Sequence, residues 1–418
     1  MTSAKFTLHP LHRAWRMLPA HRRRALFAYG TSLLAPRIDR QPPPAAGGIA
    51  VGGELSSASG LGMGARLMRR GLDHLGVPNW GLDTGDRMPG PGAPRVIERP
   101  PPGAPLLLHI NAPLMPWALL RLPRAVAHGR RVIGHWAWEL PVVPDSWRVG
   151  LRCVHEVWVP SRFTADAVAT ILPPDGRIAL RVVAYPIAVA PPRPSALDRA
   201  AFGLPAGAVV VLCAFNLASS FVRKNPLAAI AAHQAAFGAR MDRILLLKIG
   251  NTDHFPADFA LIRDAVAGAP NIRLETRTLP EGDSHALTAC ADILLSLHRS
   301  EGFGLVPAEA MLLGRPVVAT GWSGNMDFMD ATSAALVDFR LVPAHDPRGV
   351  LEAPGAVWAE PDIGSAAAHL ARLADDPAAR AALGEAGRLM AAARLGTQGL
   401  AAALAALGLP VPGMAAPA

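Results

Sequence analysis

The sequence predicts an α/β protein with two parallel-sheet domains that face each other across a cleft. Its 418 residues exceed what one ordinary core organises, so two domains of about 200 residues each are expected. Short β-rich runs alternate with helical runs, which is typical of parallel sheets covered by helices. The proline-rich segment Ala190–Ser195 separates two such series and is the best linker candidate.

The N-terminal series occupies residues 46–190. Its expected strands are 49–51, 106–110, 131–133, 156–159 and 181–183, and its expected helices are 63–75 and 163–171. Ser161 has the residue type and position of a helix N-cap. This series predicts a complete parallel-sheet domain.

The C-terminal series occupies residues 191–395. Its expected strands are 209–214, 244–249, 272–274, 293–297 and 316–320, separated by helices at 225–237, 258–267, 284–291 and 306–313. The run 209–214 is apolar throughout, as in a strand buried on both faces. Open α/β sheets bind ligands at the carboxyl ends of their strands, so the cleft is the expected site.

Residues 1–45 and 396–418 lie outside both series. The segment 12–29 mixes arginines with apolar residues, which favours either a helix lying on an anionic membrane or a solvated surface helix. Pro19 argues against one long helix there. In the tail, 400–407 has a helical pattern.

Composition and charge restrict the function classes. Apolar residues make up 51% and charged residues 17%, which indicates a globular chain. The net charge of +9 suits phosphate-bearing substrates, anionic lipid surfaces or nucleic acid, and nucleic acid is the weakest because no reading motif is present. Three widely spaced cysteines and the lack of a long apolar run predict a cytoplasmic protein, either soluble or peripheral on the inner face of the membrane.

The most informative segment is Ser300–Thr320. A strand is expected to end near Leu297, and Gly302 and Gly304 in the following loop allow the backbone to approach a ligand closely. The free amides at the start of the next helix form an anion site suited to a diphosphate. Glu309, early in that helix, can accept hydrogen bonds from the paired hydroxyls of a ribose.

This segment resembles glycosyltransferase family 4, which has the GT-B fold of two Rossmann-like domains. The resemblance rests on two glutamates, Glu301 and Glu309, with glycines between them. It implies that Glu309 holds the nucleotide ribose and that Glu301 faces the hydroxyls of the donor sugar. The loop amides that would hold sugar and phosphate belong to Gly302, Phe303, Gly304 and Leu305.

Two further C-terminal segments fit the resemblance. It places Arg223 and Lys224 against the donor diphosphate, where fixed cations stabilise the negative charge of the leaving group. The alternative is a basic pair on the surface. It also places a turn beside the donor sugar, with polar contacts from Ser323, Gly324 and Asn325, although a plain turn fits as well.

The first loop of the N-terminal series has two interpretations. Gly60, Gly62 and Ala65 satisfy the pattern G-x-G-x-x-A of dinucleotide-binding proteins, but no clear strand precedes the acidic Asp83. The resemblance instead makes this loop part of the cleft, with Ser59, Gly60 and Gly62 near donor phosphate and acceptor.

The stretch Gly134–Pro141 resembles a bacterial subgroup of these transferases. Trp136 is a candidate for stacking on a sugar, Glu139 for binding a hydroxyl, and His135 for a cleft histidine. The alternative is aromatic packing beneath a loop. His109 and Asn111, after the strand 106–110, are weaker candidates.

Together these features predict a retaining glycosyltransferase of bacterial polysaccharide or glycolipid synthesis. It would move a hexose from a nucleotide diphosphate sugar to a hydroxyl of a glycan or lipid-linked acceptor. The resemblance implies no required metal or other cofactor and a front-face mechanism, and nucleic acid is not an expected partner. The alternatives are an NAD-type oxidoreductase, a catalytically silent GT-B sugar-binding module and a nucleotide-sugar epimerase.

Overall fold

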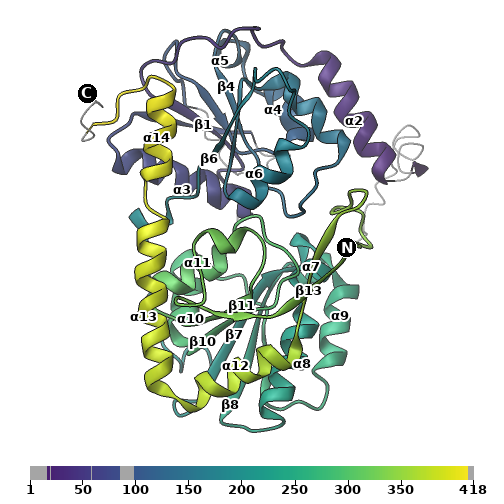
Figure 1. Ribbon diagram of the computed structural model, residues 1–418, viewed down its shortest axis with the longest axis vertical. Coiled ribbons are helices and arrows are strands. Elements are labelled where there is room, and N and C mark those ends of the chain that lie inside the picture. Colours follow the sequence, from purple (N-terminus) through teal and green to yellow (C-terminus); the bar gives the residue numbers. More distant parts are fainter. Residues whose placement is uncertain (1–16, 19, 58, 85–97, 413–418) are drawn as a thin grey trace, which may run out of the picture.

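The computed structural model describes residues 17–18, 20–57, 59–84 and 98–412, and it contains two α/β domains, one above the other in Figure 1. Each domain is built on a parallel sheet of six strands, and a separate antiparallel hairpin completes the strands of the described residues. The predicted fold class is therefore confirmed, and the architecture is that of GT-B proteins.

The N-terminal sheet has the order β2-β1-β3-β4-β5-β6. Its strands are β1 (Ile49–Gly53), β2 (Asn79–Asp83), β3 (Leu106–Leu108), β4 (Val132–His135), β5 (Glu156–Val159) and β6 (Ala179–Val182). Its helices are α3 (Gly60–His74), α4 (Met115–Arg121), α5 (Arg124–Ala127) and α6 (Arg162–Ala169), and the short 3₁₀ turn η1 (Ala112–Leu114) precedes α4. The expectation that no clear strand precedes Asp83 is wrong, because β2 is a half-buried edge strand that pairs only with β1 and so lacks a long apolar run.

The C-terminal sheet has the order β12-β11-β10-β7-β8-β9. Its strands are β7 (Val209–Asn216), β8 (Arg243–Gly250), β9 (Ile272–Glu275), β10 (Ile293–Ser296), β11 (Val317–Thr320) and β12 (Ala335–Val337). Its helices are α7 (Phe221–Lys224), α8 (Pro226–Phe237), α9 (Pro256–Ala265), α10 (Glu281–Cys290), α11 (Leu305–Leu312) and α12 (Ile363–Asp375), and the 3₁₀ turn η6 (Gly324–Asp327) follows β11.

Helices cover both faces of the C-terminal sheet because its central strands are apolar on both sides. Val211 in β7 packs in the cluster that holds α8 and α12, whereas the next side chain, Leu212, packs with α10 and α11 on the opposite face. Successive side chains of a strand point to opposite faces, so a continuous apolar run serves two helical layers.

An antiparallel hairpin extends from the C-terminal domain towards the N-terminal one (Figure 1). Its strands are β13 (Phe339–Pro343) and β14 (Val357–Pro361), which the sequence analysis did not predict. Leu351 and Trp358 from this hairpin belong to the same buried cluster as Trp147 of the N-terminal domain. The hairpin therefore ties the two domains together.

Two consecutive helices link the domains along one side of the molecule (Figure 1). Helix α13 (Pro377–Arg394) packs on the C-terminal domain through Ala391, and α14 (Gln398–Ala406) packs on the N-terminal sheet through Leu400 and Leu404. By length and composition alone the stretch 377–406 could also cross a membrane, although helices of soluble cores pass the same test.

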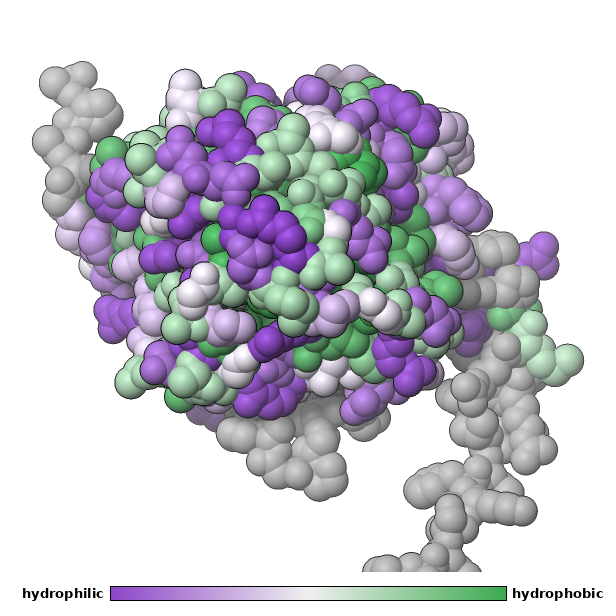
Figure 2. Space-filling view, turned by 90° about the horizontal axis from the view of Figure 1, so that it is seen from below, coloured by the Kyte–Doolittle hydropathy of each residue, from purple (hydrophilic) through white to green (hydrophobic). Residues whose placement is uncertain are grey.

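Helix α2 (Ala20–Leu34) lies on α4, where the Phe27 and Trp117 rings meet edge-on at 5.4 Å. Its outer side exposes four large side chains, Leu26, Tyr29, Leu33 and Leu34. The earlier part of the predicted membrane segment, 12–16, and Pro19 lie outside the described residues. At the opposite end of the molecule, the C-terminal domain mixes hydrophilic and hydrophobic residues over its visible face (Figure 2).

Candidate functional site

Glu301 lies at the centre of a charge cluster in the loop between β10 and α11. Its Oε1 is 2.5 Å from Lys224 Nζ, and its Oε2 is 3.1 Å from Arg223 Nη1. Burial opposes ionisation of this carboxyl, but Lys224 and Arg223 outweigh it and lower the pKa of Glu301 to about 2. The structure thus brings together the three residues that the sequence proposed as catalytic.

Arg223 is bound on several sides within the protein. Its Nη1 donates to the Ser300 carbonyl at 2.7 Å, and its Nη2 donates to the Ser219 carbonyl at 2.8 Å. Across the domain boundary, Glu139 Oε1 lies 3.6 Å from Arg223 Nη2. Burial raises the pKa of Glu139, although Arg223 acts in the opposite direction. The cluster therefore contains carboxyls from both domains.

The short helix α7 is held between two residues with left-handed backbone angles. Ser220 has φ 72° and Asn225 has φ 52°, and Ser220 Oγ accepts from the Arg223 amide at 3.3 Å. A third non-glycine residue with positive φ, Ser323 at 82°, lies in the turn after β11. Such angles cost energy outside glycine and concentrate at functional sites. Their proximity to Glu301 supports a functional role for this loop cluster.

Close backbone approach explains the glycines of the loop. A Cβ on Gly324 would lie 2.4 Å from the Gly302 carbonyl oxygen, and one on Gly302 would lie 2.8 Å from the Trp138 carbonyl oxygen. Gly304 has φ 102° and precedes the first residue of α11. Only glycine fits these positions without displacing the backbone.

The N-terminal domain docks directly on this loop. Ser161 Oγ donates to the Gly302 carbonyl at 2.6 Å, and Thr164 Oγ1 lies 3.3 Å from the same oxygen. Nearby, the Arg162 amide donates to Asp327 Oδ2 at 2.6 Å. Ser161 is the N-cap of α6, as predicted, but its contact with Gly302 was not foreseen because sequence spacing does not indicate a partner in another domain.

The turn after β11 supports the loop from below. Ser323 Oγ accepts from the Glu301 amide at 2.8 Å, and buried Asn325 bonds to the Thr320 carbonyl at 3.1 Å and to His298 Nε2 at 3.0 Å. His298 was not among the predicted site residues, because its only signal in the sequence is its place just after β10. These side chains hold the loop through contacts within the protein.

Glu309 lies on α11, one turn beyond the loop. Its side chain is 21% exposed, and its Oε1 lies 4.0 Å from His285 Nε2 of α10. Burial, reinforced by the charge of Glu281, raises the pKa of Glu309 to about 7. Leu305 is the first residue of α11, whereas the Phe303 ring is buried against Tyr185 and Phe328, so only its backbone is available to a ligand.

The first N-terminal loop leads into α3. Ser59 caps this helix by accepting from the Gly62 amide at 3.0 Å, and it also donates to Glu54 Oε2. A Cβ on Gly62 would lie 2.4 Å from the Glu54 carbonyl oxygen, whereas Gly60 faces open space. The role of these residues in the cleft stays a prediction.

Two candidates from Gly134–Pro141 are corrected by the structure. Trp136 is 0% exposed and meets Trp147 edge-on at 5.8 Å, so stacking on a sugar is wrong and aromatic packing is right. His135 is also 0% exposed and stacks between His109 and Tyr185, at 4.3 and 5.1 Å. Burial lowers the pKa of His135 to about 4. His135 is therefore a neutral core ring in this structure and does not line a cleft.

The described residues contain no cluster of three or more histidine, cysteine, aspartate or glutamate side chains that could hold a metal ion.

The two parallel sheets, the loop before α11 and the crossing helices α13 and α14 define the GT-B architecture of glycosyltransferases. Residues 210–359 match the model of a protein family described as "Glycosyl transferases group 1". This match and the fold support the GT-B superfamily and a sugar-transferring function. No curated protein sequence gives a significant match.

Several solved structures share the fold at low sequence identity. Sucrose-phosphate synthase from Thermosynechococcus elongatus has a TM-score of 0.60 and 18% identity, over 86% of this chain and 98% of that one. Anabaena Alr3699/HepE, solved in complex with UDP and glucose, has a TM-score of 0.59 and 14% identity, over 86% and 100%. A glycosyltransferase from Rickettsia africae has a TM-score of 0.58 and 12% identity, over 87% and 98%. The chain spans only 55% of S. aureus TarM and 56% of pneumococcal GtfA.

Proposed function

We propose that the protein is a retaining glycosyltransferase that moves a hexose from a nucleotide diphosphate sugar to an acceptor hydroxyl, in bacterial polysaccharide or glycolipid synthesis. The observation that carries the proposal is the meeting of Arg223, Lys224 and Glu301 at the loop that enters α11. The family match over residues 210–359 supports it, because all three residues lie in the matched region.

The charge balance of the cluster suits an anionic donor. Arg223 and Lys224 carry two positive charges, and the low pKa of Glu301 keeps one negative charge beside them. Glu139 adds a second carboxyl 3.6 Å from Arg223, and burial raises its pKa while the charge of Arg223 lowers it. Lys224, the more exposed of the two cations, and the free amides at the start of α11 both attract a diphosphate.

We assign different tasks to the two cations. The Lys224 side chain is 19% exposed and that of Arg223 is 3% exposed. Lys224 is therefore the cation that contacts the departing phosphate. Arg223 contributes its charge from a buried position, while its guanidinium N–H groups donate to the Ser300 and Ser219 carbonyls.

In the proposed step, the bond between the anomeric carbon and the phosphate oxygen breaks, and its electron pair leaves with the nucleotide diphosphate. The acceptor oxygen bonds to the same carbon from the same face. Because attack and departure share one face, the configuration is retained. The proton of the acceptor hydroxyl passes to the leaving phosphate oxygen. Lys224 and Arg223 stabilise the charge that develops, and no metal is required.

The remaining donor contacts follow the sequence prediction. We propose that Glu309 accepts hydrogen bonds from the ribose hydroxyls and that Glu301 faces the donor sugar. The partly exposed Glu309 on the first half of α11 is suitably placed for this role. The turn of Ser323, Gly324 and Asn325 departs from the prediction of polar contacts to the donor sugar, because its Ser323 and Asn325 side chains are buried and bond within the protein.

The NAD-type alternative has less support. Gly60, Gly62 and Ala65 lie inside α3, whereas a dinucleotide fingerprint needs its first glycines in the turn before the helix. Asp83 does end β2, but it accepts a hydrogen bond from Ser56 Oγ at 2.6 Å. Absorbance of bound cofactor after purification distinguishes the two functions.

We also propose that α2 rests on an anionic membrane surface. Leu26, Leu33 and Leu34 are exposed on this helix, and Arg22 and Arg37 are exposed beside them. Apolar side chains flanked by arginines are typical of helices at a lipid interface. This contact would bring the protein to a lipid-linked acceptor.

The transferase proposal is tested by thermal shift and turnover with UDP-, GDP- and ADP-sugars. We expect one nucleotide class to raise the melting temperature. Lys224→Met should then lower kcat by roughly 10²- to 10³-fold, the range found when a donor that stabilises a developing anion is lost. Lys248→Met is the matched control, because Lys248 Nζ donates to the Arg277 carbonyl at 2.8 Å and takes no part in the cluster. Full turnover by Lys224→Met contradicts the assignment, and no shift with any nucleotide contradicts the function.

A further inference from the structure

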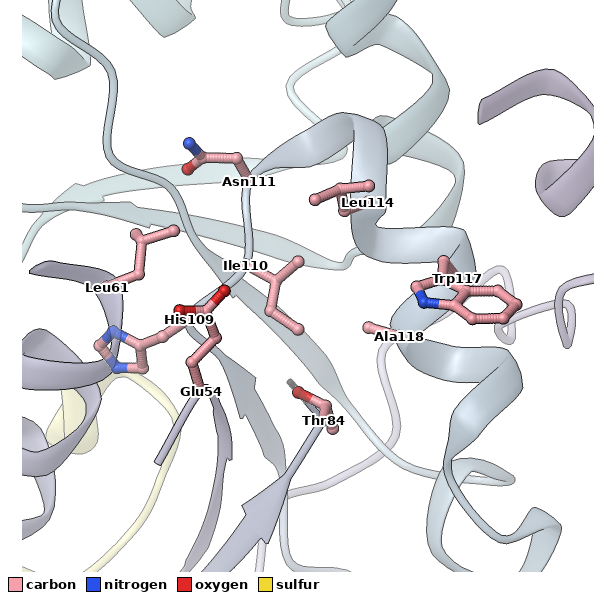
Figure 3. Close-up of a pocket in the computed structure, with 9 residues that line it drawn as sticks. All are labelled: Glu54, Leu61, Thr84, His109, Ile110, Asn111, Leu114, Trp117 and Ala118. Atoms are coloured by element: carbon pink, nitrogen blue, oxygen red, sulfur yellow. The ribbon is translucent and has the colours of Figure 1, made fainter. Parts of the chain in front are cut away.

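A pocket in the N-terminal domain lies apart from the charge cluster. Its walls surround about 430 Å³ of space, a volume that includes open solvent. Glu54, Thr84 and His109 come from the carboxyl ends of β1, β2 and β3, which are neighbours in the sheet. The opposite wall comes from the chain after β3, including Leu114 and Trp117 (Figure 3).

Two buried polar side chains of this pocket lack partners among the described residues. Thr84 is 2% exposed, and its Oγ1 has no hydrogen bond. His109 is fully buried, and neither of its ring nitrogens has one. Buried polar groups are nearly always satisfied, and an unsatisfied group is costly. These two side chains therefore point to a ligand that can both donate and accept hydrogen bonds.

The charge of the pocket selects against anions. Among the described lining residues, the ionisable ones are Glu54 and His109, and none is lysine or arginine. Burial keeps the pKa of His109 well below its usual range, so that ring is neutral. Arg66 Nη1 is bound to the Leu55 and Ser57 carbonyls, and Arg121 lies over the Trp117 ring, so neither belongs to the lining. A phosphate or carboxylate here would face Glu54 without a compensating cation.

The opposite wall is apolar. Ile110, Leu114 and Trp117 lie across from Glu54 and Thr84 (Figure 3). A sugar ring has this same division, because its hydroxyls require polar partners while its C–H face packs on apolar and aromatic side chains.

The pocket is also joined to the charge cluster. Asn111 Oδ1, on its rim, accepts from the Ala137 amide at 2.9 Å. Two residues further along the chain, Glu139 reaches Arg223. A second path runs through rings, from His109 to Tyr185 and on to Phe303 in the loop before α11. A ligand in the pocket would therefore be fixed relative to the donor loop.

We propose that this pocket binds the acceptor as an uncharged sugar unit, with hydroxyls towards Glu54, Thr84 and His109 and its apolar face against Leu114 and Trp117. The inference rests on the proposed transfer, since only that reaction requires an acceptor. It narrows the acceptor class, because a sugar phosphate or a lipid phosphate group is excluded from this position.

The test uses the full-length protein and saturation-transfer NMR in the presence of UDP. The neutral probes are methyl β-D-glucopyranoside, methyl β-D-galactopyranoside and methyl α-D-mannopyranoside, and the anionic probe is glucose 6-phosphate. We expect at least one neutral probe to bind more tightly than the phosphate. Leu114→Trp, which fills the pocket, should abolish its binding, and Thr84→Val should weaken it about fivefold to tenfold. Thr170→Val, at an exposed site on the same domain, is the control and should change nothing.

Three results would overturn the inference: tighter or equal binding of glucose 6-phosphate, neutral binding that survives both pocket variants, or no binding of any neutral probe. Thr84→Val is nearly isosteric, so it carries the test if Leu114→Trp does not fold. The melting shift with UDP reports the donor site separately. A rise in melting temperature with UDP but no glycoside binding contradicts only the acceptor inference. Glycoside binding without a rise in melting temperature for any nucleotide contradicts the proposed transferase function.

Discussion

Glu309→Gln tests the electrostatics of the donor site. Burial and the charge of Glu281 raise the pKa of Glu309 from 4.5 to about 7 in the folded protein. In the unfolded chain the carboxyl returns to its usual pKa. A folded-state pKa above the unfolded value gives stability that is complete below pH 4.5 and is lost as pH rises towards 7.

The size of this effect follows from the two pKa values. A rise from 4.5 to about 7 corresponds to about 3 kcal/mol between the protonated and ionised forms. Since 21% of the side chain is exposed, solvent screening reduces the expected value to about 2 kcal/mol. Glutamine keeps the shape of the protonated carboxyl but does not ionise. Relative to Glu309→Gln, the wild type should therefore lose about 2 kcal/mol between pH 4.5 and 8.

The assay is urea unfolding of the ligand-free protein at half-unit pH steps from 4 to 8.5, for wild type and variant. Other titrations cancel in the difference between the two curves. Glu385→Gln, at an exposed carboxylate on α13, is the control and should show no such loss. A flat difference between wild type and Glu309→Gln over this range would refute the argument. The variant should also lose the nucleotide-induced rise in melting temperature, because an amide mimics the ribose-binding carboxylate poorly.

Two further predictions concern the contact between domains and the outer surface of α2. Gly302→Ala should lower activity by roughly 10- to 100-fold, because its Cβ would lie 2.8 Å from the Trp138 carbonyl oxygen and shift the loop, whereas Gly207→Ala, in open space, should leave turnover unchanged. Equal activity of the two variants contradicts the need for close approach. Replacing Leu33 and Leu34 together by glutamine should abolish co-sedimentation with vesicles of phosphatidylglycerol and phosphatidylcholine, and Leu389→Gln on α13 should not. Pelleting that survives the double substitution rules out this membrane surface.

The central strands of the two parallel sheets could be predicted, because burial on both faces leaves continuous apolar runs such as 209–214. The edge strand β2 could not, since it contacts only one neighbour and its composition is mixed. The hairpin β13–β14 was also missed. Its first strand, Phe339–Pro343, is mostly exposed, so local burial left no pattern to detect.

The functional site could be predicted where its residues follow one another in a single segment of the chain. Glu301 and the loop glycines could be placed because a strand, a turn and a helix follow one another there. The family resemblance placed Lys224 and Glu301 at one donor site, whereas spacing alone does not bring together these two residues, which are 77 positions apart. The prediction that Trp136 stacks on a sugar was wrong, because residue type alone does not distinguish an aromatic ring in a core from one in a cleft. The contact of Ser161 with Gly302 depends on domain docking, which sequence patterns do not encode.

The position of α14 determines when the core of the N-terminal domain can be completed during synthesis. Leu400 and Leu404 fill a layer of the N-terminal core that also contains Ile49 and Val51. The ribosome must therefore produce about 350 further residues, from β1 to α14, before that layer closes. A nascent chain halted after β6 would leave this layer without Leu400 and Leu404, and the uncovered apolar surface favours aggregation until translation ends.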